Sequence, residues 1–182
     1  MLGDLGIELV TVTDLGIDGE VVEDAETFEG NARKKATELA RRSGLSALAD
    51  DSGLEVDALG GAPGVYSARF AGPGATDGTN VDKLLGAIVD VDDPARTARF
   101  RCVLALAGPS GAIEHVTDGR CEGRITRERR GEGGFGYDPV FVPAGETRTM
   151  AELTSEEKNA RSHRGAAVRA MRAFFQQVRA SQ

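Results

Sequence analysis

Two spacings of apolar residues alternate along the chain and predict a mixture of strands and helices. The first apolar run, Ile7 to Val12, is short and rich in β-branched residues, which predicts a strand. It follows segment 1–6, whose terminal glycine is typical of the last turn of a helix. From Thr27 the spacing becomes helical, with Thr27 as the cap and Gly44 as the stop. The apolar face of that helix consists of Phe28, Ala32, Ala36, Leu39 and Ala40.

The middle of the chain predicts a strand, a loop and a second helix. Leu45 to Ala49 has the composition of a short buried strand that ends at an acidic pair. Gly60 to Gly78 is rich in Gly, Pro and Ala and predicts a long loop. Asp77 or Thr79 then caps a helix that continues to Ile88.

The second half predicts a hairpin, a further strand and a final helix. Phe100 to Leu106 alternates as a strand does, 108–111 supplies the turn and 112–117 returns. Val140 to Val142 predicts another strand. The last helix places Val168, Met171, Phe174, Phe175 and Val178 on one face, opposite Arg169, Arg172 and Arg179. Helices mixed with strands, and a hairpin between them, predict an α/β domain with a mixed sheet and a lobe.

Composition and charge narrow the functional classes. The chain has 182 residues, 40% hydrophobic and 28% charged, which is ordinary for one globular domain. A net charge of -7 argues against a protein that binds nucleic acid through many phosphate contacts. No apolar run approaches the roughly 20 residues that span a bilayer, and the N-terminus does not resemble a signal peptide. We therefore expect a cytoplasmic protein with no membrane or nucleic-acid partner, in which Cys102 and Cys121 are free thiols.

An acidic pair follows the predicted strand that ends at Ala49. Adjacent carboxylates in a half-buried position repel each other unless a cation or a proton lies between them, so Asp50 and Asp51 predict a metal site. The alternative is a solvated Asp-Asp turn before Ser52. Glu23 lies among several further acids, and sequence spacing does not choose among them.

Two other segments combine unusual residue types. The segment 158–165 is basic and polar in an acidic protein and suits an anion site. Its alternative, solvation of a helix N-terminus, is weakened because helix N-termini prefer acids to cations. The segment 135–139 places aromatic rings beside a carboxylate, which suits stacking on a base and accepting a hydrogen bond from it. The alternative there is a turn with core aromatics.

Four spaced motifs occur together, in a fixed order. They are Ala49-Asp50-Asp51-Ser52-Gly53-Leu54, Gly60-Gly61-Ala62-Pro63-Gly64, Gly134-Phe135-Gly136-Tyr137-Asp138-Pro139 and Ser162-His163-Arg164-Gly165. With them the chain resembles the inosine triphosphate pyrophosphatase family, whose members hydrolyse ITP, dITP and XTP to the monophosphate and pyrophosphate. The resemblance extends from about Thr11 to the last helix.

The resemblance implies a role for each matching residue. It places the metal-binding acids at Glu23 and Asp51, with Asp51 and its neighbour Asp50 as catalytic candidates, and the metal as Mg²⁺. Oxygen ligands without a Cys or His cluster agree with Mg²⁺. The residues expected to contact substrate are Lys35 and Ser52 at the phosphates, Phe135, Gly136, Tyr137 and Asp138 at the base, and the basic Lys158, His163 and Arg164. An Asp138 acceptor beside an Arg164 donor would discriminate against ATP by leaving buried polar groups unpaired.

The resemblance also implies a fold, an assembly and a departure from the family. The family fold is an elongated mixed α/β structure with a cleft between two lobes, usually a homodimer. Family members begin with a strand, a Thr-Gly-Asn-like loop carrying a Lys, and a helix. We expect residues 1–182 to form one such domain lacking that strand, the phosphate-binding loop and most of the helix, with Met1 a misassigned start or an internal Met. The expected function is hydrolysis of ITP, dITP and XTP, which removes non-standard purines. The alternative is a catalytically impaired nucleotide-binding protein, or a truncated gene product, that uses the same cleft.

Overall fold

The computed structural model describes residues 6–180, which fall into two compact units. Unit 1 contains the chain up to Asp51, residues 102–119 and the chain from Arg164 onward. Unit 2 contains residues 52–101 and 120–163. The boundaries fall inside three strands, so each of these strands contributes residues to both units.

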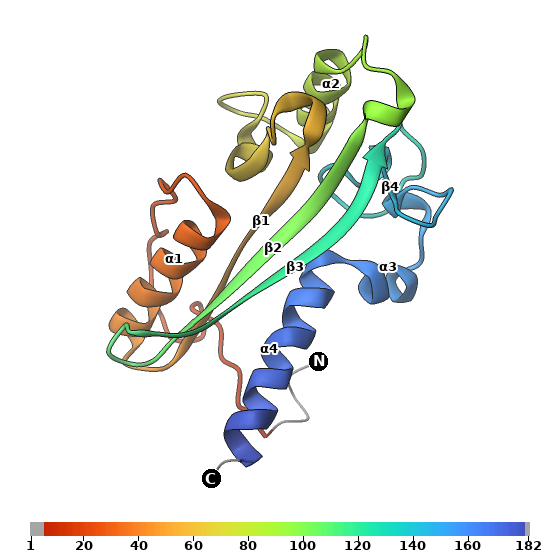
Figure 1. The fold of residues 1–182 in the computed structure, drawn as a ribbon. Helices are drawn as coiled ribbons and strands as arrows, with labels where there is room; N and C mark the ends of the chain where they lie inside the picture. Colours follow the sequence, from red (N-terminus) through yellow and green to blue (C-terminus); the bar gives the residue numbers. More distant parts are fainter. Residues whose placement is uncertain (1–5, 181–182) are drawn as a thin grey trace. The chain divides into compact units, whose positions relative to one another are not determined.

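One sheet, four α-helices and five short 3-10 helices make up the regular structure of residues 6–180 (Figure 1). The helices are α1 (Phe28–Ser43), α2 (Asp77–Ala87), α3 (Ser155–Arg161) and α4 (His163–Ala180). The strands are β1 (Ala47–Val56), β2 (Thr97–Ala107), β3 (Ile113–Ile125) and β4 (Phe141–Pro143), hydrogen-bonded in the order β1-β2-β3-β4.

The sheet is antiparallel, so the mixed sheet predicted from the sequence is wrong. Strands that follow each other in the chain lie beside each other in the sheet, and the turn 108–111 joins β2 to β3 as expected. The predicted strand Val140 to Val142 is shifted, because Val140 completes a short 3-10 helix and β4 begins at Phe141. β4 pairs with the end of β3, with Gly123 opposite Pro143 and Ile125 opposite Phe141.

Helix α1 has the bounds and caps that the sequence predicts. The Thr27 side chain accepts a hydrogen bond from the Gly30 N–H at 3.0 Å, which satisfies one free donor of the first turn. Gly44 adopts the left-handed conformation, φ 68°, and its N–H donates to the Ala40 carbonyl at 2.9 Å. Phe28 and Ala40 are buried on the apolar face, so the helix is fixed on unit 1 at both of its ends.

The rest of the unit 1 core forms between α4 and β2. Cys102, Leu104 and Leu106 pack against Ala167 and Met171. The apolar face of α4 is buried at its centre and exposed near its end, where Val178 is 40% exposed.

The expected strand Ile7 to Val12 is wrong, because this segment has no strand partner and joins no sheet. Its β-branched composition favours an extended backbone, but a strand also requires a neighbouring edge to pair with. Leu9 and Val10 are largely exposed. The following residues form a turn in which the Thr11 hydroxyl donates to the Asp14 carboxylate at 2.6 Å. The helix end expected over 1–6 falls mainly on residues 1–5, outside the described residues.

Strand β1 continues through the acidic pair, so the prediction that it ends at Ala49 is wrong. Leu54 and Val56 lie after the polar residues and are fully buried, and their packing keeps the chain extended. The loop Gly60 to Gly78 follows and contains the 3-10 helix η3 (Gly64–Arg69). The buried Ser67 hydroxyl anchors that helix, because it accepts from the Leu54 N–H at 2.9 Å and donates to the Gly64 carbonyl at 2.6 Å.

The N-cap of α2 is Thr76, and neither Asp77 nor Thr79 caps the helix as predicted. Thr76 and Thr79 form a reciprocal capping box, in which each side chain accepts from the other residue's backbone N–H. The core of unit 2 is formed by buried residues of α2, of the four strands where they belong to unit 2, and of the adjoining loops. It includes Leu54, Val81, Leu84, Ile88, Phe100, Tyr137 and Phe141.

None of the helices within residues 6–180 is long and apolar enough to cross a membrane.

We expect Leu84→Ala to lower the free energy of unfolding by about 2 to 5 kcal/mol, because Leu84 is fully buried and its loss leaves a cavity. Val89→Ala is the control, since Val89 is 62% exposed in the same unit and should cost less than about 0.5 kcal/mol. Chemical denaturation followed by circular dichroism measures both values. Equal losses for the two variants would show that α2 does not pack as described.

Candidate functional site

Two carboxylates of unit 1 converge on one lysine. Lys35 projects from α1, Asp51 from β1, and Glu23 from the segment that leads into α1. The Lys35 ammonium lies 2.7 Å from Glu23 Oε1 and 3.7 Å from Asp51 Oδ1. Asp51 is buried, and Lys35 is mostly covered, so these charges interact with less screening than they would at the surface. The cluster therefore combines two anionic groups with one cation, as expected from the roles that the family resemblance implies for these residues.

Asn31 fixes the orientation of Asp51. The Asn31 amide donates to Asp51 Oδ2 at 3.0 Å, and its carbonyl oxygen accepts from the Ala25 N–H at 2.9 Å. Asn31 is only 1% exposed, so both of these hydrogen bonds are protected from water. It was not assigned a role from the sequence. The available signal was its spacing, because Asn31 lies four residues before Lys35 and therefore on the same side of α1.

Asp50 has different partners from Asp51. Side chains alternate along a strand, so these neighbours on β1 point to opposite faces. Arg164, the second residue of α4, donates to Asp50 Oδ2 at 2.8 Å, and the Cys102 thiol lies 3.8 Å from the same oxygen. Burial lowers the pKa of Arg164, but the hydrogen bond to Asp50 and its charge outweigh burial and raise the pKa overall. Asp50 and Arg164 thus form a second charged pair within unit 1.

A third group of assigned residues gathers in unit 2 around a buried carboxylate. Asp138 is 4% exposed, accepts a hydrogen bond from the Phe135 N–H at 2.9 Å and contacts the Lys158 ammonium. The same ammonium lies 4.8 Å from the centroid of the Phe135 ring, in a cation–π contact. The Phe135 side chain is otherwise exposed at 63%. An exposed aromatic face beside a lysine and a carboxylate can stack on a planar ring and hydrogen-bond to its edge.

Glycines allow this loop to close on Asp138. Gly134 has a φ of +80°, and a Cβ atom there would lie 2.2 Å from Asp138 Oδ2 and 2.9 Å from Lys158 Nζ. Only glycine fits at this position. Gly136 also has a positive φ, and its N–H donates to Asp77 Oδ2 at 2.6 Å at the start of α2.

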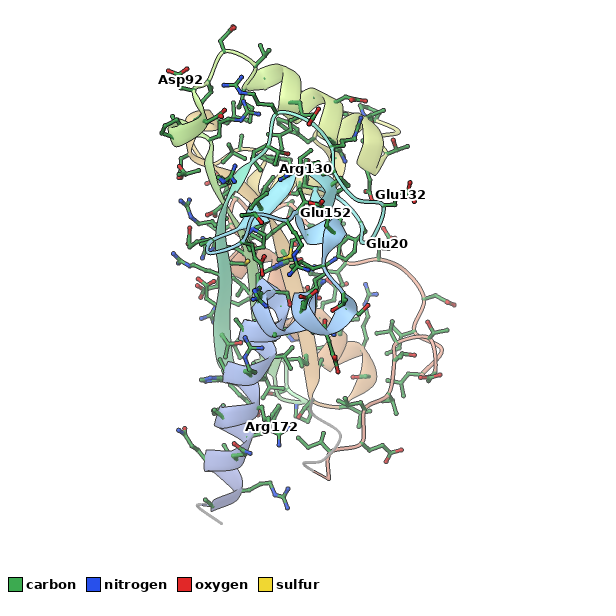
Figure 2. The ribbon with its side chains drawn as sticks, turned by 90° about the vertical axis from the view of Figure 1, so that its right-hand side faces the viewer. Glu20, Asp92, Arg130, Glu132, Glu152 and Arg172 are labelled. Atoms are coloured by element: carbon green, nitrogen blue, oxygen red, sulfur yellow. The ribbon has the colours of Figure 1, made fainter. Side chains whose placement is uncertain are left out.

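The loop is also held on the side that precedes Gly134. The Gly133 N–H donates to the Ala151 carbonyl at 3.1 Å, and the Thr149 hydroxyl donates to the Arg130 carbonyl at 2.7 Å. The Arg130 and Glu152 side chains lie close together, with Nε and Oε2 4.0 Å apart (Figure 2). The exposed Phe135 ring is therefore carried by an anchored loop.

The remaining assigned residues have other surroundings. Tyr137 is buried in the core of unit 2, its hydroxyl donates to the Ser67 carbonyl at 2.9 Å, and burial followed by the charge of Asp77 raises its pKa. His163 stacks on Phe100 with the ring centroids 4.9 Å apart. Ser52 follows Asp51 directly on β1.

The expected pairing of Asp138 with Arg164 differs from the contacts in the structure. Asp138 contacts Lys158, whereas Arg164 donates to Asp50. Each of these two acids is thus paired with a cation of its own unit. In the described part of the chain, no group of three or more His, Cys, Asp and Glu side chains is placed to hold a metal ion.

The antiparallel α/β fold thus carries three groups of paired acidic and basic side chains, two in unit 1 and one in unit 2. A model of the Ham1 family matches residues 1–174, and the chain belongs to this family.

Its relatives include proteins named dITP/XTP pyrophosphatase. The one from Desulfotalea psychrophila is 49% identical over 98% of this chain and 78% of its own length. The one from Desulforamulus reducens is 53% identical over 93% of this chain and 84% of its own length.

Solved structures of the same family share the fold. A HAM1 protein from Coxiella burnetii matches with a TM-score of 0.91 and 44% identity, over 97% of this chain and 89% of that protein. A nucleoside-triphosphatase, also named dITP/XTP pyrophosphatase, from Mycobacterium abscessus matches with a TM-score of 0.80 and 47% identity, over 93% of this chain and 88% of that protein.

We expect both cysteines of the native protein to resist iodoacetamide at pH 7.5. Burial, followed by the charge of a neighbouring acid, raises the pKa of Cys102 to about 12 and that of Cys121 to about 11, so almost no thiolate is present at this pH. The thiolate fraction, and with it the labelling rate, should rise as the pH rises. Intact mass spectrometry measures labelling, and protein unfolded in guanidinium is the control in which both thiols react. Rapid labelling of the folded protein would contradict the described burial.

Proposed function

We propose that this chain is a dITP/XTP pyrophosphatase that hydrolyses ITP, dITP and XTP to the nucleoside monophosphate and pyrophosphate. The observation that carries the proposal is the partly buried cluster of Glu23, Lys35 and Asp51, because two fixed carboxylates and a cation are what a triphosphate and its counter-ion require. Relatives of this name that are about half identical over more than nine tenths of the chain support it.

The acids of the cluster fit Mg²⁺. Glu23 and Asp51 direct oxygen atoms at the same cationic group, and Mg²⁺ is typically held by one or two carboxylates together with waters and substrate phosphates. These two residues are the proposed metal ligands. When bound, Mg²⁺ supplies positive charge that neutralises the oxygens of the phosphate groups.

The chain's own residues account for the proton and for part of the charge. Asn31 donates to Asp51 Oδ2, and the Lys35 ammonium lies 3.7 Å from Oδ1, so the carboxylate is held in one orientation, in which it would accept a proton from water. The water oxygen bonds to the α-phosphorus, the bond from that phosphorus to the bridging oxygen breaks, and pyrophosphate leaves with the electron pair. Lys35 lies where its ammonium can neutralise a phosphate oxygen. Asp50 is a second candidate for the base, and Ser52, His163 and Arg164 are proposed substrate contacts on the basis of the family resemblance.

The group of side chains in unit 2 has the chemistry needed to recognise a purine base. Hypoxanthine and xanthine present an N1–H donor beside an O6 acceptor, which matches a carboxylate acceptor beside an ammonium donor, as in Asp138 and Lys158. Adenine presents the reverse pattern and would place its N1 acceptor against the Asp138 carboxylate and its amino group against the Lys158 ammonium. The exposed Phe135 ring provides the stacking surface. Considered each by itself, the unit 2 group matches the purine, and the unit 1 cluster matches the triphosphate.

The proposed assembly is a homodimer, as the resemblance implies, and sedimentation equilibrium measures it.

Binding without turnover is the other candidate function. Pyrophosphate release measured beside binding calorimetry, both with dITP and Mg²⁺, distinguishes hydrolysis from binding alone.

We expect Asp51→Asn to reduce hydrolysis of dITP by at least about 100-fold, because an amide is a poor Mg²⁺ ligand and does not accept the proton. Asp92→Asn is the matched control, since Asp92 lies exposed on the surface of unit 2 and makes no side-chain cap hydrogen bond (Figure 2). Pyrophosphate release at saturating Mg²⁺ measures both variants. Turnover by Asp51→Asn within a few-fold of the parent protein would remove Asp51 from the mechanism.

We expect Asp138→Asn to lower the ratio of kcat/KM for ITP to that for ATP by at least about 10-fold, because an amide can also donate to adenine N1. Phe135→Ala is the comparison variant. It removes the stacking surface and should reduce kcat/KM for both substrates by similar factors, which leaves the ratio almost unchanged. An unchanged ratio in Asp138→Asn, in protein whose melting temperature shows that it is folded, would refute the reading role of Asp138.

A further inference from the structure

The loop that carries Phe135 is attached to helix α2 by contacts that the proposed reaction does not use. We define the Phe135 loop as residues 126–137, which lie between the end of β3 and the short 3-10 helix that begins at Asp138. Four of its twelve residues are glycines. Glycine loses more conformational entropy on folding than any other residue, so a segment of this composition keeps one conformation only where several contacts fix it.

Two consecutive N–H groups of the loop donate to two different carboxylates. The Phe135 N–H donates to Asp138, which the proposed function assigns to the edge of the purine. The next N–H, that of Gly136, donates to Asp77 Oδ2 at 2.6 Å. Asp77 is the first residue of α2 and is exposed, so this hydrogen bond is not needed to compensate a buried charge. The peptide groups on either side of Phe135 are therefore fixed by one group of the candidate site and by one group outside it.

A second contact joins the same loop to the same helix. The Arg129 side chain donates to the Gly78 carbonyl at 2.7 Å, and its guanidinium lies 3.0 Å from Asp82 Oδ1. Figure 2 shows the loop, with Arg130 and Glu132 labelled, beside α2. An exposed ion pair contributes little to the stability of a fold, so we expect this contact to act on the placement of the loop.

Helix α2 is a firm support for both contacts. Val81 and Leu84 are buried in the core of unit 2. Asn80 is 3% exposed, accepts from the Ala71 N–H at 2.7 Å and donates to the Ala68 carbonyl at 3.1 Å. The helix is thus held by contacts that do not involve the Phe135 loop.

The Phe135 ring depends on its backbone for its position. The side chain is 63% exposed, and its cation–π contact is with Lys158, whose ammonium is carried by a flexible stem. If the backbone moved, the ring would sample many positions, and a base would bind more weakly because ordering the loop opposes binding. The order of the loop should therefore affect affinity for the purine more than the breaking of the phosphate bond.

We propose that Asp77 and Arg129 are positioning residues for purine recognition, which hold the Phe135 loop on α2 in the conformation that binds the base. Neither residue contacts the substrate in the proposed function. The inference rests on that function, since it takes Phe135 as the stacking surface. A loss of base binding that is equal in the ground state and the transition state raises KM and leaves kcat unchanged.

The test compares Asp77→Ala with Asp77→Asn in the 182-residue protein. Asparagine loses the charge that favours a helix N-terminus but keeps an oxygen that accepts from the Gly136 N–H, whereas alanine loses both. We expect Asp77→Ala to raise KM for dITP by at least about 5-fold and to change kcat by less than about 2-fold. Asp77→Asn should keep both values within about 2-fold of the parent protein. Equal increases in KM for the two variants would assign the effect to the helix charge and overturn the proposal.

Hydrogen exchange and product binding test the anchor without turnover. Backbone amides of residues 134–137 should exchange at least about 5-fold faster in Asp77→Ala and at the parental rate in Asp77→Asn, with melting temperatures within about 4 °C of the parent protein. In calorimetry, inosine monophosphate, which has the purine but no anhydride bond, should bind Asp77→Ala at least about 5-fold more weakly. Unchanged exchange in Asp77→Ala would overturn the proposal, and so would faster exchange with unchanged KM and affinity.

A second variant and a matched control complete the test. Arg129→Ala should raise KM in the same direction, and the double variant with Asp77→Ala should exceed either single one, because both contacts hold one loop. Asp92→Ala removes an exposed acid of unit 2 that makes no side-chain cap hydrogen bond, and it should leave KM and exchange unchanged. A parental KM in the double variant would refute the positioning role.

Failure of the proposed function would look different from failure of this inference. In the first case the parent protein releases no pyrophosphate from dITP, and exchange together with inosine monophosphate binding still decides whether Asp77 positions the loop. In the second case the parent protein turns over dITP, and the Asp77→Ala and Arg129→Ala variants match it in KM.

Discussion

The buried carboxylate of Asp51 is the constraint on which the arrangement of unit 1 depends. A charged group taken out of water destabilises the fold by several kcal/mol unless partners replace the lost solvation. Those partners, Asn31 and Lys35, come from consecutive turns of α1. Both residues lie in the first half of α1, which begins directly after the Thr27 cap. The same contacts therefore stabilise the fold locally and position the candidate catalytic group.

Unit 2 meets the same constraint in a different way. Asp138 is more deeply buried than Asp51 and receives one backbone N–H and one ammonium group. The backbone donor is available because Gly134 lets the chain turn tightly enough to bring the Phe135 N–H to the carboxylate. As a consequence, the exposed aromatic ring of Phe135 is held on an anchored loop. In both units a buried acid organises the polar groups around it, and this explains why so many assigned residues are each other's partners.

The sequence predicted local features well and long-range pairing poorly. The bounds of α1, the hairpin turn and the final helix follow from caps, glycines and periodicity, which act over a few residues. The extension of β1 past Ala49 depends on packing of Leu54 and Val56 in a core built from distant segments, and the pattern around the acids gives no sign of it. Ile7 to Val12 shows the converse, because strand propensity without a paired edge produces no strand. The candidate residues were identified through spaced motifs, but the partners of Asp50 and Asp138 were not, since charge complementarity between distant residues carries no sequence spacing.

The alternation of Asp50 and Asp51 on β1 has a consequence for how such a chain can change in length. Neighbouring residues on a strand face opposite sides, so adding or removing a single residue between Ala47 and Asp50 would exchange the two acids. Asp50 would then meet the α1 side and Asp51 the Arg164 side, without any change in the amino acids themselves. Side chains do not alternate between two faces in this way along the segment between Gly60 and Gly78. Its exposed parts can therefore gain or lose residues one at a time. Heritable variation in length should therefore accumulate in that loop and be absent from the first half of β1.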